Sequence, residues 1–480
     1  MRRLTTITFF MLLTACSLAP TYHRPDMRIP STYKENGSWL YATPQTANRA
    51  RGPWWEMYAD PELNRLEQQV ESANQNLKAA IARYDEACAA ASIARADYFP
   101  TINGVGNMNR AKTSANVANP QNVQVASDKT LAINATYELD VWGRVRNSVA
   151  AAKSVARASA ADLAVIHLSL QAELANDYFS LRGDDASQRV LNETVTAYQK
   201  ALYLTQQRYR GGIVSAGVVD QATHQLESAK TQAADMRLKR SQLEHAIAIL
   251  IGQPPAAFHL PAAMPKAKIV TMAPALPSTL LERRPDIAEA EQFVQAANAN
   301  IGVARVAFYP SFNLAGGIGL ESASLSHLFQ GPSLIWALGP SVASAFLNPG
   351  SLPLVMQTLF DGGRIRGLSD QAQAKYVETV AHYRQTVLTA YQEVEDNLVA
   401  IRELDHERKS QNLASQAADR SLMQAWYQYQ GGLTTYLDVV VIQNIALQAR
   451  LSDIQVNTQR QMASVALIKA LGGGWRGGGV

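Results

Sequence analysis

Apolar side chains recur at helical spacing over several long stretches of the chain. They occupy every third or fourth position through residues 145–209, where no proline intervenes, and again through residues 219–250, where only Arg240 breaks the series. Gly183-Asp184-Asp185 interrupts the first stretch without ending it, and residues 437–468 repeat the pattern. Spacing that persists over so many turns predicts long helices packed as coiled coils, the first of them about 95 Å long.

Other stretches alternate with period two. Apolar and polar residues take turns from 131 to 139, and asparagines alternate with apolar residues over 102–109. Residues 312–320 and a segment near Leu354–Phe360 form the corresponding pair in the second half, less regular because three prolines lie between 336 and 358. Alternation over about ten residues fits a tilted membrane-spanning strand, apolar outward and polar inward. A hairpin on a soluble sheet would show the same alternation.

The chain contains one large module twice. Tyr209-Arg210-Gly211-Gly212 returns 220 residues later as Tyr429-Gln430-Gly431-Gly432, and Gly143-Arg144-Val145-Arg146 returns as Gly363-Arg364-Ile365-Arg366. Further upstream the copies are 210 residues apart. Because glycine adopts positive φ at no steric cost, each glycine pair is expected to end one helix and turn the chain.

These patterns, together with the features of the N-terminus described below, divide the chain into six segments. They are a signal peptide (1–15), an extended and lipidated N-terminal segment (16–59), a first repeat (60–252), a proline-rich connector (253–279), a second repeat (280–472) and a flexible tail (473–480). The first helix is expected to begin with Asp60 as N-cap and Pro61 at its first position. It is expected to run to about Tyr98, because Pro100 stops it.

The N-terminus has the features of an export signal. Arg2 and Arg3 precede a short apolar core, residues 7–13, which is too short to span a bilayer. Leu13-Thr14-Ala15-Cys16 resembles the bacterial lipobox, which implies cleavage before Cys16 and lipidation of its thiol; an ordinary signal peptide with an incidental cysteine is the alternative. Ser17 in the next position resembles lipoproteins sorted to the outer membrane. No other apolar run is long enough for a membrane helix, so a membrane crossing would have to use strands.

Composition and motifs exclude several functions. The balance of 44 basic and 40 acidic residues gives no electrostatic case for nucleic acid. Two cysteines allow no disulfide framework, and the eight histidines form no metal-ligand pattern. Gly316-Gly317-Ile318-Gly319 lacks the following lysine of a phosphate-binding loop. We therefore expect no enzyme, no metal and no cofactor, and interpret Glu393 and Glu395 as solvated helix residues.

Six phrases, in order along nearly the whole mature chain, resemble the TolC-like outer-membrane factors of tripartite efflux pumps, in their lipoprotein (NodT-type) branch. They are Trp54-Trp55 with Asp60-Pro61-Glu62-Leu63, Leu139 to Arg144, Leu281 to Ile287, Ala297 to Pro310, Phe360 to Arg364, and Ala470 to Trp475. Residues 345–358 look like an insertion relative to that family.

The resemblance implies a mainly α fold with a membrane β-barrel part. Each chain of a homotrimer would supply four strands to a shared 12-stranded barrel, continued by a long α-helical coiled-coil tunnel in the periplasm. Strand arithmetic agrees, because four strands cannot close a barrel and twelve form a conduit. The implied partners are a periplasmic adaptor (membrane fusion protein), an inner-membrane pump and outer-membrane lipid.

Two functions remain open on these grounds. The first is a passive exit duct in the cell outer membrane, lipid-anchored and extending into the periplasm, that conducts substrates delivered by the pump and adaptor. The second is a periplasmic coiled-coil scaffold or tethering lipoprotein that does not conduct. An envelope hydrolase would need a catalytic cluster, which the sequence lacks.

The helix turns are the expected docking tips for the adaptor, because they should lie farthest from the strands and carry small residues. The residues concerned are Tyr209, Gly211, Gly212, Gly431 and Gly432. The alternative is that the glycines serve the turn alone.

A periplasmic gate is expected just inside these tips, because Tyr429 and Asp438 match residues that constrict the entrance in the family. Three Asp438 carboxylates would form a ring that favours cations; the alternative is that Asp438 only suits the helix N-terminus. The sequence departs from the family at Val218, which replaces the acidic partner of Tyr429, and at Val441, which replaces a second acidic ring. Closure should therefore depend on packing by Leu437 and Val441.

Overall fold

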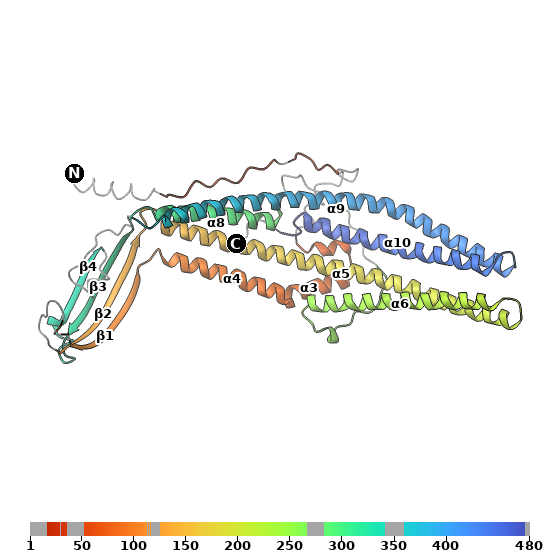
Figure 1. Cartoon of the computed structure of the whole chain (residues 1–480), viewed down its shortest axis with the longest axis horizontal. Helices are drawn as coiled ribbons and strands as arrows, with labels where there is room; N and C mark the ends of the chain where they lie inside the picture. Colours follow the sequence, from red (N-terminus) through yellow and green to blue (C-terminus); the bar gives the residue numbers. More distant parts are fainter. Residues whose placement is uncertain are drawn as a thin grey trace. The chain divides into compact units, whose positions relative to one another are not determined.

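The fold is known from a computed structural model, which describes residues 17–28, 30–35, 52–112, 114, 116, 125–265, 283–340 and 360–475. The chain divides into two compact units. We call Met1–Pro25, Tyr84–Ser159 and Ala290–Tyr383 the sheet unit, and Asp26–Arg83, Ala160–Glu289 and Arg384–Val480 the hairpin unit. Figure 1 labels the helices and strands of both.

The helices repeat in length as well as in order. The first repeat contains α3 (Pro61–Ala73), α4 (Gln75–Ala96), α5 (Arg144–Arg210) and α6 (Ala216–Leu250), and the second contains α8 (Pro285–Val306), α9 (Arg364–Gln430) and α10 (Tyr436–Ala470). α5 and α9 have 67 residues each, α6 and α10 have 35, and α4 and α8 have 22. Short 3-10 helices lie at Trp54–Tyr58, Pro255–Ala257 and Gly331–Ser333. None of the described helices combines the length and the apolarity that a bilayer crossing requires.

The prediction of one helix from Asp60 to about Tyr98 is wrong at Asn74. The N-cap is confirmed, since the Asp60 carboxylate accepts hydrogen bonds from the backbone of the first turn of α3. The backbone of Asn74 adopts an extended conformation, which separates α3 from α4. Its side chain forms hydrogen bonds in both directions. Its Nδ2 donates to the Leu250 carbonyl at 2.7 Å, and its Oδ1 accepts from the Leu77 amide at 2.9 Å.

The start of α8 in the second repeat shows a corresponding contact with different chemistry. Arg284 takes the place of Asn74, and its Nη1 donates to the Ala470 carbonyl at 3.0 Å. Gly252 and Gly472 lie beside these junctions with φ of 71° and 89°. A Cβ at Gly472 would lie 2.1 Å from the Arg283 carbonyl oxygen, so only glycine fits there. The duplication therefore extends to the contacts that close each module.

The sheet contains four antiparallel strands in the order β1-β2-β3-β4, which lie side by side in Figure 1. Their bounds are Thr101–Lys112, Val125–Leu139, Phe312–Ser322 and Leu334–Pro340. The first three predicted strands are confirmed. The prediction that β3 pairs with a segment near Leu354–Phe360 is wrong, because β3 pairs with Leu334–Pro340. Phe360 lies in no strand, and residues 354–359 lie outside the described residues.

Strand register separates apolar from polar residues across the sheet. Ile133 pairs with Ile318, which pairs with Trp336, and all three side chains are exposed on one face. Asn103 pairs with Asn134 one position along, on the opposite face. We call the exposed apolar face of the sheet the apolar band, which comprises Ile102, Leu131, Ile133, Ile318, Leu320, Leu334, Trp336 and Leu338.

Candidate functional site

The two predicted helix turns are present and close in the same way. Gly212 and Gly432 have φ of 73° and 77°, as the predicted turns require. After α9, the Leu433 amide donates to the Gln428 carbonyl at 2.8 Å and the Gly432 amide to the Tyr429 carbonyl at 3.1 Å, the Schellman pattern of a helix C-terminus. Apart from the glycine itself and the two residues next to it in the chain, no heavy atom lies within 4 Å of the position that a Cβ would take at Gly212 or Gly432. Both turns therefore face open space within the described chain.

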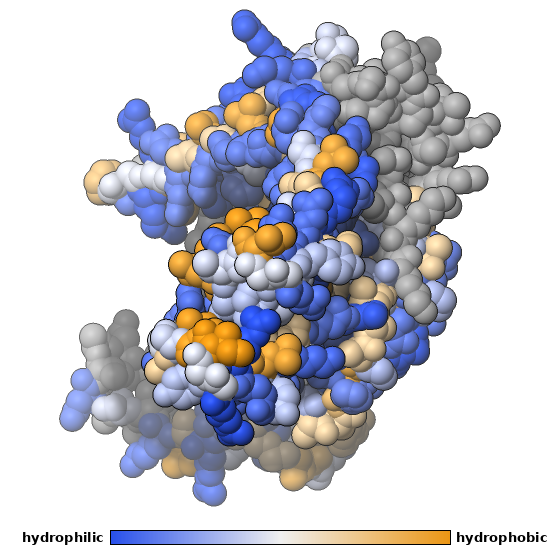
Figure 2. Space-filling view, turned by 90° about the vertical axis from the view of Figure 1, so that its right-hand side faces the viewer, coloured by the Kyte–Doolittle hydropathy of each residue, from blue (hydrophilic) through white to orange (hydrophobic). Residues whose placement is uncertain are grey.

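Large apolar side chains project beside the turns. Ile213 is 73% exposed and Leu433 is 82% exposed, and Tyr209 is also exposed. Figure 2 looks onto the end of the hairpin unit that carries the turns, where hydrophobic patches interrupt a polar surface. Exposed apolar residues at a helix turn cost solvation energy unless a partner covers them, which makes the turns a candidate interaction surface.

Tyr429 lies in an aromatic cluster between the two helical hairpins. Its ring contacts those of Trp426 and Tyr436 with centroids 5.9 and 5.7 Å away, and the Arg208 guanidinium lies 4.6 Å from its centroid. Val218 packs against the same cluster. The cluster joins α5, α6, α9 and α10 by apolar and cation–π contacts.

Asp438 has the helix-start role that the sequence left as an alternative. Its Oδ2 accepts hydrogen bonds from the Thr434 hydroxyl at 2.7 Å, the Thr435 hydroxyl at 2.6 Å and the Thr435 amide at 3.0 Å. Together with Thr435 it forms a capping box for α10. These donors hold the pKa of the Asp438 carboxyl below its ordinary value, the Thr435 hydroxyl most of all. The side chain is nevertheless exposed, so capping does not remove its charge from the surface.

Leu437 and Val441 are only about half covered by their own chain. They are 53% and 50% exposed, and with Ile445 they mark one face of α10 at intervals of four residues. We call Leu437, Val441 and Ile445 the α10 stripe. Asp438 lies next to this stripe, so the four predicted gate residues, Tyr429 included, are gathered at the start of α10 and the end of α9. About half of the surface of Leu437 and Val441 is therefore left uncovered within the described chain.

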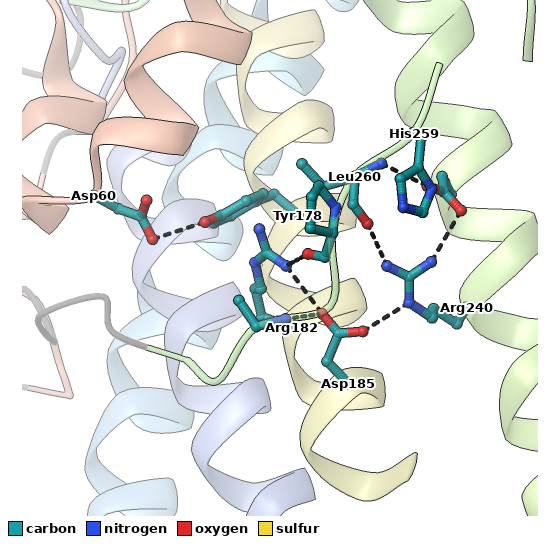
Figure 3. A network of polar contacts seen from close by, with 10 residues as sticks. Asp60, Tyr178, Arg182, Asp185, Arg240, His259 and Leu260 are labelled. Carbon is teal, nitrogen blue, oxygen red and sulfur yellow. Dashed lines mark hydrogen bonds and ion pairs between the residues drawn. The ribbon is translucent and has the colours of Figure 1, made fainter. Parts of the chain in front are cut away.

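A buried ionic network lies in the hairpin unit, and no prediction from the sequence included it (Figure 3). The Asp185 carboxylate on α5 accepts a hydrogen bond from the Arg182 guanidinium at 2.9 Å and another from the Arg240 guanidinium of α6 at 2.7 Å. Its side chain is 2% exposed. The network extends to Glu244, which pairs with Arg240 at 2.9 Å and also accepts from the Leu260 amide at 2.6 Å. Next to the network, the Tyr178 hydroxyl donates a hydrogen bond to the Asp60 carboxylate at 2.8 Å.

The network fixes the segment after α6. Arg182 donates to the Pro261 carbonyl at 2.8 Å, and the Ala263 amide donates to Asp185 at 3.0 Å. In the second repeat the equivalent pair is Asp405 with Arg460, at 2.8 Å. The signal in the sequence was that Asp185 and Arg240 interrupt apolar series on two adjacent helices.

The interpretation of Glu395 as a solvated residue is wrong. Both Glu395 oxygens accept backbone amides of the N-terminal segment, from Lys34 at 2.7 Å and Glu35 at 3.0 Å. Glu393 accepts a hydrogen bond from Arg284 at 2.7 Å, but its side chain is 47% exposed, in agreement with its interpretation as a solvated residue. Cys16, the predicted lipidation site, lies outside the described residues.

Comparison with known proteins identifies the class. The family model described as outer membrane efflux protein matches residues 66–253 and 276–473. Outer membrane protein OprJ of Pseudomonas aeruginosa is 32% identical over 471 residues, covering 97% of this chain and 94% of its own length. Cation efflux system protein CusC of Escherichia coli K12 is 28% identical over 468 residues, covering 97% of each.

Solved structures agree in fold. The outer-membrane channel OprN superposes with a TM-score of 0.86 at 26% identity, covering 96% of this chain and all of that one. The Campylobacter jejuni CmeC outer membrane channel superposes with a TM-score of 0.88 at 25% identity, covering 97% and 96%. The protein therefore has the fold of the trimeric, TolC-like outer-membrane channels.

The chain belongs to the outer membrane efflux protein family. It is the outer-membrane component of an efflux pump and extends from the outer membrane into the periplasm. Members of this family are channel proteins, which decides against the scaffold.

Proposed function

We propose that three copies form a passive exit duct, each contributing its four strands to one closed barrel of twelve. The apolar band is the observation that carries this proposal. Its residues other than the partly exposed Leu320, among them Ile133 and Trp336, are exposed in one chain. Asn103 and Asn134 lie on the opposite face. A lipid-facing apolar surface and a polar lumen require this division. Closure would also pair the free edges of β1 and β4 with neighbouring copies.

Energy for transport would come from an inner-membrane pump, reached through a periplasmic adaptor that docks at the turns. The exposed side chains of Tyr209, Ile213 and Leu433 support this, together with the open space around Gly212 and Gly432. Cys16 would carry the lipid anchor. Gly211 and Gly431 would allow adaptor helices to approach closely, since each precedes the positive-φ glycine and carries no side chain.

The gate would be the Asp438 ring together with the α10 stripe. In a trimer three exposed carboxylates near one axis would favour cations and bind multivalent ones. Leu437 and Val441 would supply the contacts between copies that narrow the entrance, and the Tyr429 cluster would hold α9 and α10 in place behind them.

Single-channel recording in planar bilayers tests both the duct and its gate. The wild-type protein should show openings that are blocked by multivalent cations. In Asp438→Asn, block and cation preference should both fall. Because Asp438 also caps α10, Thr435→Ala is the matched control: it removes the cap, at a cost of about 1 kcal/mol, and keeps the carboxylate. It should conduct like wild type.

The pH dependence follows from the depressed pKa of Asp438. A carboxyl with a lowered pKa stays ionised as pH falls through its ordinary value of about 3.9. Cation preference should therefore persist at that pH and disappear only below it. If the wild-type protein showed no channel openings, the exit duct would be refuted. If Asp438→Asn and Thr435→Ala changed cation block and preference equally, Asp438 would act only as part of the helix cap and not as a cation-binding ring.

A further inference from the structure

The first described residues of the chain are held against the helix ends of the sheet unit. The Ser17 hydroxyl donates to Asn147 Oδ1 at 3.2 Å. A Cβ at Gly302 would lie 2.6 Å from the Ala19 Cβ, and one at Gly143 would lie 3.4 Å from the Ser17 Cα. The two glycines therefore form a cradle that admits this segment. Consecutive Cα atoms are about 3.8 Å apart, so a lipid on Cys16 would have to enter the membrane close to this cradle.

Two guanidinium groups flank this segment. Arg305 Nη1 donates to the Leu18 carbonyl at 3.3 Å. A Cβ at Gly143 would lie 3.5 Å from Arg146 Nη2 as well as 3.4 Å from the Ser17 Cα, which places this guanidinium beside the segment. Arg146 is paired with Asp140 at 3.0 Å, whereas Arg305 is exposed and has no carboxylate partner among the described residues.

The arginines at these helix ends occur in duplicate. Arg95, Arg144 and Arg146 of the first repeat return as Arg305, Arg364 and Arg366 of the second. Glu138 and Asp140 pair with Arg144 and Arg146 in the first repeat. Asp361 accepts the Gly363 and Ile365 amides and lies beside Arg364.

Positive charge is left over after this pairing. Arg95, Arg305 and Arg366 are exposed and form no ion pair within the described part of the chain. We call these three residues the unpaired arginines.

Aromatic side chains lie beside the ends of the strands that adjoin these helix ends. Phe99 precedes β1 and is 65% exposed, and Phe308 and Tyr309 are exposed just before β3. Trp142 follows β2, stacks on Tyr309 with centroids 4.9 Å apart and donates to the Pro310 carbonyl at 2.9 Å. Aromatic rings at the ends of membrane strands lie at the lipid headgroups. The unpaired arginines therefore lie where lipid phosphates would be.

We propose that the unpaired arginines bind the phosphate groups of anionic phospholipids in the leaflet that would hold the Cys16 acyl chains. A guanidinium matches a phosphate with two parallel hydrogen bonds and is the side chain best suited to this contact. Charge complementarity favours an anion, and the aromatic residues beside the strand ends favour a lipid headgroup over a soluble anion. The proposal rests on the membrane assignment of the sheet in the exit duct.

The test is lipid binding by the full-length protein in detergent. Phosphatidylglycerol and phosphatidylethanolamine are titrated separately, and bound lipids are counted by native mass spectrometry. Arg305→Gln/Arg366→Gln should weaken phosphatidylglycerol binding by about fivefold for each arginine removed, and should weaken phosphatidylethanolamine binding less, because the ammonium group of that lipid balances its phosphate charge. The charge-matched control is Arg237→Gln/Arg420→Gln, at exposed positions of α6 and α9 in the hairpin unit. It should bind phosphatidylglycerol like wild type.

Three results would overturn the proposal: unchanged binding in the first variant, equal loss in the control, or full displacement of the lipid by inorganic phosphate, which would indicate a free-anion site. Channel recording separates this failure from failure of the exit duct. If only the lipid assignment is wrong, both variants still open in a neutral bilayer. If the sheet does not cross a membrane, the wild type does not open either.

Discussion

Asp185→Ala should destabilise the protein by about 3–5 kcal/mol, the cost of breaking a buried ion pair by removing one partner. The loss leaves the Arg182 and Arg240 guanidinium groups, which are 7% and 14% exposed, without the carboxylate that both bind. It also removes the acceptor of the Ala263 amide, so the segment after α6 loses one of its attachments. The expected measurement is a lower urea midpoint for loss of helical signal.

The duplicated chain supplies the control for this variant. Asp405→Ala removes the equivalent carboxylate, whose side chain is 35% exposed, whereas that of Asp185 is 2% exposed. Because solvent screens such a pair, this variant should cost only about 1 kcal/mol. Equal losses in the two variants would mean that burial of Asp185 does not determine its contribution.

Gly431→Trp should abolish efflux while trimers still form, giving the drug susceptibility of a deletion strain. Gly431 is the better position for this test than Gly432, whose φ of 77° would make any side chain strain the turn itself. The nearest atom to a Cβ at Gly431 is the Tyr427 carbonyl oxygen, at an ordinary contact distance of 3.5 Å. The indole would therefore project from an undamaged turn and block the approach of the adaptor.

The matched control is Ala414→Trp, at an exposed position of the same helix about 25 Å from the turn. It adds the same side chain and should leave efflux normal. Heat-resistant trimers on gels check the assembly of both variants. Normal resistance with Gly431→Trp would contradict docking at the turns, and loss of efflux in both variants would assign the effect to the added bulk alone.

Much of the fold could be predicted because its signals are local. Helical spacing, strand alternation and the repeat located the long helices, three of the strands and both turns. The break at Asn74 was missed because apolar spacing continues across it from Val70 to Leu77, and because its cause is a hydrogen bond to distant Leu250. The fourth strand was misplaced because Leu334–Pro340 has no polar residue and therefore no alternation to recognise.

The site divides in the same way. The glycine turns were predictable because positive φ is a property of single residues. The Asp185–Arg240 pair joins residues 55 positions apart, and only the interruption of two apolar series indicated it. Glu395 could not be recognised, because its partners are backbone amides of an irregular segment that carries no motif.

The two turns are alike in backbone but differ in the helix starts that come after them. Thr435 and Asp438 form a capping box at the start of α10, whereas Ser215 at the start of α6 forms no side-chain cap. A trimer of this chain would carry six turns of nearly equal shape, of two kinds in alternation. A partner that contacts only the shared backbone shape would bind with a stoichiometry of six per trimer. One that contacts the Asp438 carboxylate would bind with a stoichiometry of three, so counting bound partner chains distinguishes the two modes of recognition.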